Sequence, residues 1–243
     1  MKSIIKSFFR KLGIEINRIP ESYVGDIPDA EFYKPVFSPW LGYGDFKDLY
    51  EKIRKHTIIS AERCFILYSL ALQALHLKGD FVECGVYKGG SAKLLAEVLT
   101  PKSNPTKLLH LFDAFQADYD TESEKDLLKR DFFPKIELQK VKELMGKRND
   151  IVFHPGIIPH TFSGLEKIRI SLAHIDVVFF QAVLDCCEFI IPRLVRGGLV
   201  IFDDYGSPLC PGARKAVDQY FRIRPEEPLV LSTGQALIFK SSI

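Results

Sequence analysis

The sequence predicts an α/β fold with a mostly parallel sheet, and three observations support this prediction. Short apolar runs of strand length alternate with longer segments of helical composition from residue 57 onward. A turn with three glycines joins the first apolar run to a helical segment, and acidic residues end several of the runs. Because parallel sheets carry helices on both faces and bind ligands at the carboxyl ends of their strands, we expect the functional residues at that edge.

The glycine turn is the feature around which we place the site. The first strand ends at Glu83, and Gly85, Gly89 and Gly90 follow before a helix expected over residues 91–99. Backbone N–H groups and a helix N-terminus then point to one place, which suits a nucleotide or a carboxylate. We expect glycine there because a ligand lying on the backbone leaves no room for Cβ, and because the turn can require a positive φ. A tight turn without a ligand is the alternative, and neither the P-loop nor the Gly-x-Gly-x-x-Gly pattern is present.

The other elements follow from hydrophobic patterning. Four further strands are expected at residues 108–112, 151–153, 172–178 and 199–202, the last entered through Gly197-Gly198, with a closing hairpin at 229–231 and 236–239. Helices are expected over 57–78 and 211–221, and residues 189–194 belong to a helix after the fourth strand. Residues 116–150 are charged and helical in composition but too long for a plain crossover, so we expect an excursion near the pocket.

Residues 1–56 are expected to form an N-terminal arm on a domain of residues 57–243. Residues 1–14 have the pattern of an amphipathic helix with basic residues opposite its apolar side, which predicts packing on the domain, packing on a second subunit or contact with a membrane surface. Residues 19–50 contain four prolines and many aromatic residues, which indicates an irregular segment covering the core. It could form a lid or a dimer contact.

Two loops that follow strands carry further candidate residues. Asp113 ends the second strand, where an acidic residue of a nucleotide-binding βαβ unit can accept hydrogen bonds from ribose hydroxyls; the alternative is a cap on the next turn. His160 follows the third strand and is a candidate catalytic base, or else a surface residue.

Acidic residues at the ends of the fourth and fifth strands predict a metal site. Asp176 and the pair Asp203-Asp204 should converge beside the glycine turn, and we see no basic partner for them in the sequence. Three carboxylates without a basic partner repel one another unless a cation neutralises them. Oxygen ligands suit Mg²⁺, which would also lower the pKa of a coordinated hydroxyl. The alternative for one of Asp203 and Asp204 is a turn cap.

The segment from Glu83 to Ser91 resembles the S-adenosylmethionine loop of class I methyltransferases, and together with residues 197–217 it is similar to the macrocin O-methyltransferase family. The resemblance covers about residues 57–240 and implies a class I methyltransferase (Rossmann-like) sheet with a C-terminal antiparallel hairpin. It implies that S-adenosylmethionine contacts Glu83, Gly85, Val86, Tyr87, Gly89, Gly90, Ser91, Asp113 and Gly156. It also implies Mg²⁺ on Asp176, Asp203 and Asp204, with Asp176 acting in catalysis, and matches Thr57 and Arg63 to a family helix.

The sequence departs from the family at one place near the expected site. The family usually carries a second acid and a Glu shortly after the fourth strand, where this chain has Val178 and Gln181. The departure concerns the acceptor geometry and the base. The resemblance therefore predicts an O-methyltransferase acting on a hydroxyl of a sugar or glycosylated small molecule. The alternatives are a catechol-like small acceptor and a cofactor-binding protein that has lost catalysis.

Composition narrows the class of partner. The chain of 243 residues is 47% hydrophobic and 26% charged, enough for a substantial core. The net charge is +2, and residues 1–20 alone carry an excess of four positive charges, so the body lacks the broad basic face that nucleic acid requires. Five scattered cysteines show neither metal spacing nor a disulfide framework. We expect a cytoplasmic homo-oligomer, with membrane association through residues 1–14 as an alternative.

Overall fold

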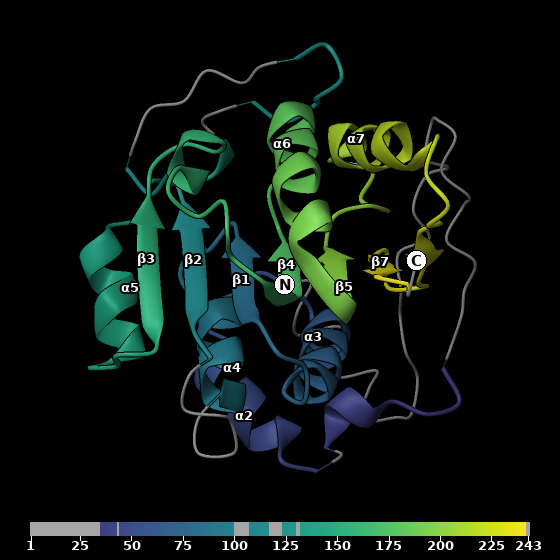
Figure 1. Cartoon of the computed structure of the whole chain (residues 1–243). Helices are drawn as coiled ribbons and strands as arrows, with labels where there is room; N and C mark the ends of the chain where they lie inside the picture. Colours follow the sequence, from purple (N-terminus) through teal and green to yellow (C-terminus); the bar gives the residue numbers. More distant parts are fainter. Residues whose placement is uncertain (1–34, 43, 100–106, 117–122, 130–131, 242–243) are drawn as a thin grey trace, which may run out of the picture. The chain divides into compact units, whose positions relative to one another are not determined.

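The sheet has seven strands in the order β3-β2-β1-β4-β5-β7-β6 (Figure 1). The computed structural model describes residues 35–42, 44–99, 107–116, 123–129 and 132–241. Neighbouring pairs from β3 to β5 are parallel, whereas β7 pairs antiparallel with both β5 and β6. The strands are β1 (Asp80–Cys84), β2 (Leu109–Asp113), β3 (Ile151–Pro155), β4 (Ile170–Ile175), β5 (Leu194–Phe202), β6 (Leu229–Val230) and β7 (Ala236–Phe239). The predicted parallel sheet with a closing hairpin is confirmed.

Helices cover both faces of this sheet because its strand residues alternate between two cores. One core contains Phe81 and Leu172 and packs against α2 (Phe46–Ile53), α3 (Ala61–Ala74), α4 (Gly90–Leu99) and α5 (Leu138–Met145). The other contains Val82 and Ala173 and packs against α6 (Phe180–Ile190) and α7 (Pro211–Phe221). Short 3-10 turns are η1 (Pro39–Leu41), η3 (His160–Phe162) and η4 (Ile191–Arg193). The order reverses at β1, whose neighbours are β2 and β4, and such a switch point opens a crevice for a ligand.

Helix α2 is the main element that patterning did not predict. Phe46 and Ile53 are fully buried, and the Phe46 ring packs edge-on against Phe65 of α3. Residues 35–243 form one compact unit, so the core begins upstream of residue 57, where we placed the start of the domain. The predicted helix of residues 1–14 and the first part of the arm lie outside the described residues. Within the described residues, no helix has the length and apolarity needed to cross a membrane.

Two further expectations differ from the structure. The only α-helix among the described residues of the segment 116–150 is α5, and residues 123–129 and 133–137 are irregular although their composition is helical. Strand β5 begins at Leu194, before Gly197-Gly198, and the register against β4 shifts at these glycines. Gly197 has φ +76°, and a Cβ on Gly198 would lie 2.8 Å from the Val195 carbonyl oxygen, so both glycines belong to a bulge.

A histidine pair joins β2 to β3. The His110 Nδ1 and His154 Nε2 atoms are 2.9 Å apart, and the His154 ring stacks on Phe112 with ring centroids 4.3 Å apart. Asp80 lies 3.7 Å from the other nitrogen of His110. Burial, together with the charge of His110, lowers the pKa of His154 from 6.5 to about 4.

This lowered pKa predicts a pH-dependent stability. Between about pH 4 and 6.5 the unfolded chain binds a proton at His154 that the folded chain does not, so stability falls as the pH falls through this window. His154→Phe keeps a ring on Phe112 and removes the titrating group. We expect urea unfolding at several pH values to give a shallower decline for the variant than for the wild type. Parallel curves would show that His154 does not titrate in this way.

Candidate active site

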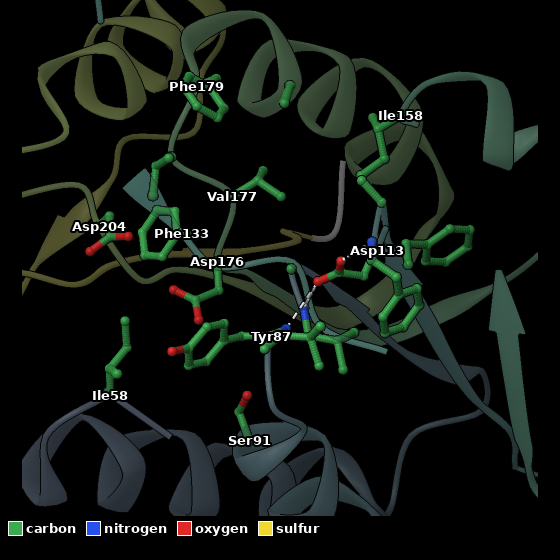
Figure 2. A pocket seen from close by; sticks show the side chains of 18 of the residues that line it. Ile58, Tyr87, Ser91, Asp113, Phe133, Ile158, Asp176, Val177, Phe179 and Asp204 are labelled. Atoms are coloured by element: carbon green, nitrogen blue, oxygen red, sulfur yellow. Dashed lines mark hydrogen bonds between the residues drawn. The ribbon is translucent and has the colours of Figure 1, made fainter. Parts of the chain in front are cut away.

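A cavity of about 270 Å³ lies at the carboxyl ends of β1, β2 and β4 (Figure 2). Its wall combines the glycine turn, the end of β2, the loop after β3, the segment before α3, the segment after β4, and residues 133–136 of the predicted excursion. That the excursion reaches the pocket is thereby confirmed. Among the residues assigned from the sequence to the site or matched to a family helix, those that line the cavity are Thr57, Arg63, Gly85, Val86, Tyr87, Ser91, Asp113, Gly156, Asp176 and Asp204.

Asp113 holds the glycine turn in place. Its Oδ2 accepts hydrogen bonds from the backbone N–H groups of Val86 at 2.7 Å and Tyr87 at 2.9 Å, and its Oδ1 accepts one from Phe115 at 2.6 Å. Figure 2 shows this carboxylate at the cavity, between β2 and the turn. Tyr87 has φ +50°, a backbone conformation that needs such support. Asp113 therefore caps the turn that follows β2 through its Oδ1, which was the alternative in the sequence analysis. A contact of Asp113 with ribose stays a prediction.

The three glycines are required by the protein's own backbone and side chains. A Cβ on Gly85 would lie 2.4 Å from the Asp176 carbonyl oxygen, and one on Gly90 would lie 2.6 Å from the Thr57 Cβ. A Cβ on Gly89 would meet the Val141 side chain at 2.9 Å. The expected positive φ is found at Gly85 (+91°) and Gly89 (+86°), whereas exclusion of Cβ by a ligand stays a prediction. The segment before α3, helix α5 and the loop after β4 approach the turn closely, and Gly89 and Gly90 do not line the cavity.

Glu83 is not at the cavity surface either. It is fully buried, and its Oε1 lies 2.9 Å from His174 Nδ1 on the neighbouring strand β4. The other ring nitrogen of His174 lies 3.4 Å from Asp203 Oδ1, which also accepts a hydrogen bond of 2.7 Å from Gln235. A buried polar chain therefore links β1, β4, β5 and the hairpin beneath the cavity. Asp203 belongs to this chain and does not line the cavity.

Arg63 pairs with the acidic residues, and our expectation that they lack a basic partner is wrong. Its Nη2 forms ion pairs with the carboxylates of Asp203 and, at 3.1 Å, Asp204. The same nitrogen donates to the Asp203 carbonyl oxygen at 3.1 Å. Sequence reasoning placed Arg63 on a helix far from the acids in the chain, and only the packing of α3 beneath the cavity brings them together.

Of the three acids predicted to hold a metal, Asp176 and Asp204 line the cavity (Figure 2). Burial raises the pKa of Asp176 from 3.8 to about 7, with His174 opposing and the charge of Asp204 adding to the shift. His174, Asp176 and Asp203 each offer an atom within 4.8 Å of the others, which is a donor set suited to a cation. Asp204 is not in that set, although it follows Asp203 directly.

His160 does not reach the cavity. It is exposed on the turn η3 and lines a separate surface hollow with residues such as Glu166 and Arg193. The structure therefore gives no geometric support for His160 as a base in this cavity.

The side of the cavity opposite the glycine turn is apolar. Val178, which stands where the family carries its second acid, is buried in this wall next to Val177 and Phe179. Phe133 lies across the cavity and meets the Tyr87 ring edge-on at 6.3 Å (Figure 2). Gln181 does not line the cavity and is exposed on α6, where it donates to Asp185 at 2.8 Å.

Asp126 is a structural residue of the site that sequence reasoning missed. Its Oδ1 accepts a hydrogen bond of 2.9 Å from the backbone N–H of Phe180, the first residue of α6. A Cβ on Gly212 in the first turn of α7 would lie 1.8 Å from the same oxygen. A carboxylate at two helix N-termini is favourable, so Asp126 fastens residues 123–129 next to the segment that carries the apolar wall. Pro211-Gly212 in the sequence indicated the start of a helix but not the residue that contacts it.

Removing this carboxylate should loosen the excursion. Asp126→Ala leaves the Phe180 N–H without its acceptor and should lower stability by about 0.5–2 kcal/mol, the usual cost of a lost helix cap. Trypsin should then cleave faster at Lys125 and Lys129, which flank the fastening point. Asp126→Asn keeps an oxygen acceptor and should cleave at a rate close to the wild type. Equal cleavage of Asp126→Ala and wild type would show that Asp126 does not hold the segment.

Comparisons with known proteins agree with the fold described above. The chain is 29% identical over 153 residues to the 8-demethyl-8-(2,3-dimethoxy-alpha-L-rhamnosyl)-tetracenomycin-C 4'-O-methyltransferase of Streptomyces olivaceus, a match that spans 58% of each protein. It is 27% identical over 180 residues to the mycinamicin III 3''-O-methyltransferase of Micromonospora griseorubida, which covers 68% of this chain and 70% of that enzyme.

Solved structures show the same fold. The O-methyltransferase NovP superposes with a TM-score of 0.69 at 22% identity, covering 76% of this chain and 82% of that chain. The calicheamicin methyltransferase CalS11 superposes with a TM-score of 0.61 at 18% identity, covering 87% of this chain and 99% of that chain. The model of the macrocin-O-methyltransferase (TylF) family matches residues 54–230, which is most of the chain. The resemblance predicted from the glycine turn and the acidic motifs is therefore confirmed, and the chain belongs to the macrocin O-methyltransferase (TylF) family.

Proposed function

We propose that this protein transfers a methyl group from S-adenosylmethionine to a hydroxyl of a sugar or glycosylated small molecule. The observation that carries the proposal is that a single cavity extends from the glycine turn and Asp113 to the carboxylates of Asp176 and Asp204. A donor bound at the turn would face an acceptor bound at the acids. The names of the relatives support the acceptor class, since the Streptomyces enzyme is named for a rhamnosyl group and the Micromonospora enzyme for a mycinamicin.

The cofactor end of the cavity offers backbone and small polar groups. We assign the contacts with S-adenosylmethionine to Gly85, Val86, Tyr87, Ser91, Asp113 and Gly156, all of which line the cavity. Glu83, Gly89 and Gly90 support this surface from behind. When bound, the cofactor would supply a methyl group for in-line displacement by a hydroxyl oxygen, a reaction that depends mainly on alignment. The chain's contribution is to hold the turn open through Asp113.

At the acceptor end, Asp176 is placed to receive the proton of the reacting hydroxyl. It lines the cavity directly after β4, and Val178 and Gln181 have replaced the two further acidic groups usual in the family. The apolar wall of Val177, Val178 and Phe179 would exclude water around that hydroxyl and pack on an apolar part of the acceptor. A deoxysugar or an aglycone next to the reacting sugar has such a part.

The donor set fits a magnesium ion as an assisting cation. Asp203 Oδ2 is buried against the Arg63 guanidinium, and Asp176 and His174 each place an atom within 4.8 Å of an Asp203 oxygen. Mg²⁺ prefers such oxygen ligands, so Asp176 and Asp203 would hold it with Asp204 beside them. A bound Mg²⁺ would lower the pKa of a coordinated acceptor hydroxyl.

The first test is cofactor binding. We expect S-adenosylhomocysteine to bind with a dissociation constant on the order of micromolar, about −8 kcal/mol. Asp113→Ala leaves three backbone N–H groups without an acceptor and should weaken this binding by about 1–3 kcal/mol. Asp185→Ala, on α6 away from the cavity, is the matched control. Calorimetry that shows no heat with the wild-type protein would contradict the methyltransferase function.

The second test is the acceptor. Transfer of a labelled methyl group should be measured with a panel of sugar nucleotides, deoxysugar glycosides and a catechol, with and without Mg²⁺. Turnover on glycosides supports the proposal, whereas turnover confined to the catechol would assign the protein to small aromatic acceptors. Cofactor binding without turnover on any member would favour a protein of this fold that has lost catalysis.

A further inference from the structure

Arg63 occupies the position at which the acidic residues would hold a cation. Its Nη2 pairs with the Asp203 carboxylate, lies 3.1 Å from Asp204 Oδ1 and donates to the Asp203 carbonyl oxygen. The Asp203 side chain has no exposed surface, and that of Asp204 is 15% exposed. A buried carboxylate needs a positive partner, and here the guanidinium supplies one.

No other permanently charged cation in the described part of the chain is shown to pair with Asp203 or Asp204. His174 lies between two of the acids, with one ring nitrogen against Glu83 and the other against Asp203. Four carboxylates therefore lie at or beneath this end of the cavity, those of Glu83, Asp176, Asp203 and Asp204, and Arg63 is the counter-charge of Asp203 and Asp204.

The way in which Arg63 is held suggests that it can leave. Only Nη2 makes the contacts described above, and the buried Arg63 Nε has no hydrogen-bond partner among the described residues. A permanent structural arginine commonly uses two nitrogens on one carboxylate in a parallel fork, which adds geometric specificity. Arg63 lines the cavity, and its side chain is 22% exposed, so the guanidinium has a route away from Asp203.

A divalent cation would use the same oxygen atoms. Asp203 Oδ2 is the carboxylate atom against Arg63, and Asp203 belongs to the donor set with Asp176 and His174. A guanidinium and a divalent cation carry like charges, so both cannot occupy one side of the same carboxylate without strong repulsion. Arg63 and the cation are therefore alternative partners of Asp203.

We propose that Arg63 is an exchangeable counter-cation, which pairs with Asp203 and Asp204 in the metal-free protein and must release them when a divalent cation binds. The inference rests on the magnesium site of the proposed function. It makes Arg63 a positioning residue for the acids, and it predicts that the wild-type protein binds metal more weakly than its carboxylates alone would allow.

The test is the affinity of the full-length protein for Mn²⁺ alone, measured by calorimetry and by the electron paramagnetic resonance signal of free Mn²⁺. Arg63→Gln removes the competing charge and should bind Mn²⁺ about tenfold more tightly than the wild type. Its melting temperature without metal should be lower than that of the wild type, and the difference should shrink as Mn²⁺ saturates the site. Arg54→Gln, an exposed arginine of α2's C-terminal cap, is the matched control and should behave as the wild type.

A second variant keeps the test decisive if Arg63→Gln does not fold. Arg63→Lys retains the charge but cannot span both carboxylates as the longer guanidinium does, so its Mn²⁺ affinity should lie between those of the wild type and Arg63→Gln. Affinity equal to or below the wild type in the folded variants would overturn the proposal, as would absence of Mn²⁺ binding to every protein. Binding of S-adenosylhomocysteine in the same samples separates these failures from failure of the proposed methyl transfer.

Discussion

Gly85→Ala is expected to lower the free energy of unfolding by on the order of 4 kcal/mol and to remove S-adenosylhomocysteine binding with it. The added Cβ would lie 2.4 Å from the Asp176 carbonyl oxygen and 2.7 Å from the Asp176 carbonyl carbon, both of which are backbone atoms. Gly85 also has φ +91°, which strains any L-residue. Relief requires that the loop after β1 move away from the loop after β4, and these two loops form opposite sides of the cavity.

The matched control is Gly164→Ala. Gly164 has φ +84°, but no atom lies within 4 Å of the position its Cβ would take. This variant therefore isolates the backbone strain, about 1–2 kcal/mol, and should bind the cofactor normally. Urea unfolding and calorimetry on both variants check the prediction. A Gly85→Ala protein with the stability of Gly164→Ala would show that the β1 and β4 loops can separate at little cost.

The sheet could be predicted from sequence because its signals are local. Apolar runs with acidic or glycine endings mark β1, β2, β4 and β5, and the Gly85 to Ser91 turn marks the start of α4. Helix α2 escaped prediction because prolines and aromatic residues surround it, and its burial depends on contacts of Phe46 with α3. The irregular conformation of residues 123–129 was not predicted for a different reason. Their composition favours a helix, but contacts such as the cap that Asp126 forms on α6 hold them in an irregular conformation.

The candidate site could be predicted only as far as its residues share one edge of the sheet. Asp176 and Asp204 reach the cavity as expected, because parallel strands bring their carboxyl ends together. The pairing of Arg63 with Asp203 could not be predicted, since 140 positions separate them in the chain. Glu83 illustrates the same limit. Alternate residues of a strand point to opposite faces of the sheet, and this decides whether a side chain lies under a helix layer or reaches the cavity. The partner of Glu83, His174, lies on another strand.

Asp176→Asn should lower kcat for methyl transfer by roughly 10²- to 10⁴-fold, the usual contribution of a positioned acid or base. Asparagine keeps the shape of the side chain but cannot take a proton and is a weaker cation ligand. Binding of S-adenosylhomocysteine should change little, because the cofactor contacts lie on the turn from Gly85 to Ser91 and on Asp113. The rate is measured on the best acceptor of the panel at saturating cofactor.

Two comparison variants separate catalysis from folding. Asp203→Asn should lose stability as well as rate, because its carboxylate is tied to Arg63 and lies against His174 in a buried chain. Asp176→Asn should be at least as stable as the wild type, since it removes a buried charge near Asp204 and Glu83. Asp185→Asn, the same chemical change outside the cavity, should affect neither quantity. If Asp176→Asn retained full turnover, with or without EDTA, the proton would have to leave the acceptor hydroxyl by another route. Neither Asp176 nor a metal bound to it could then be the group that accepts or activates that proton.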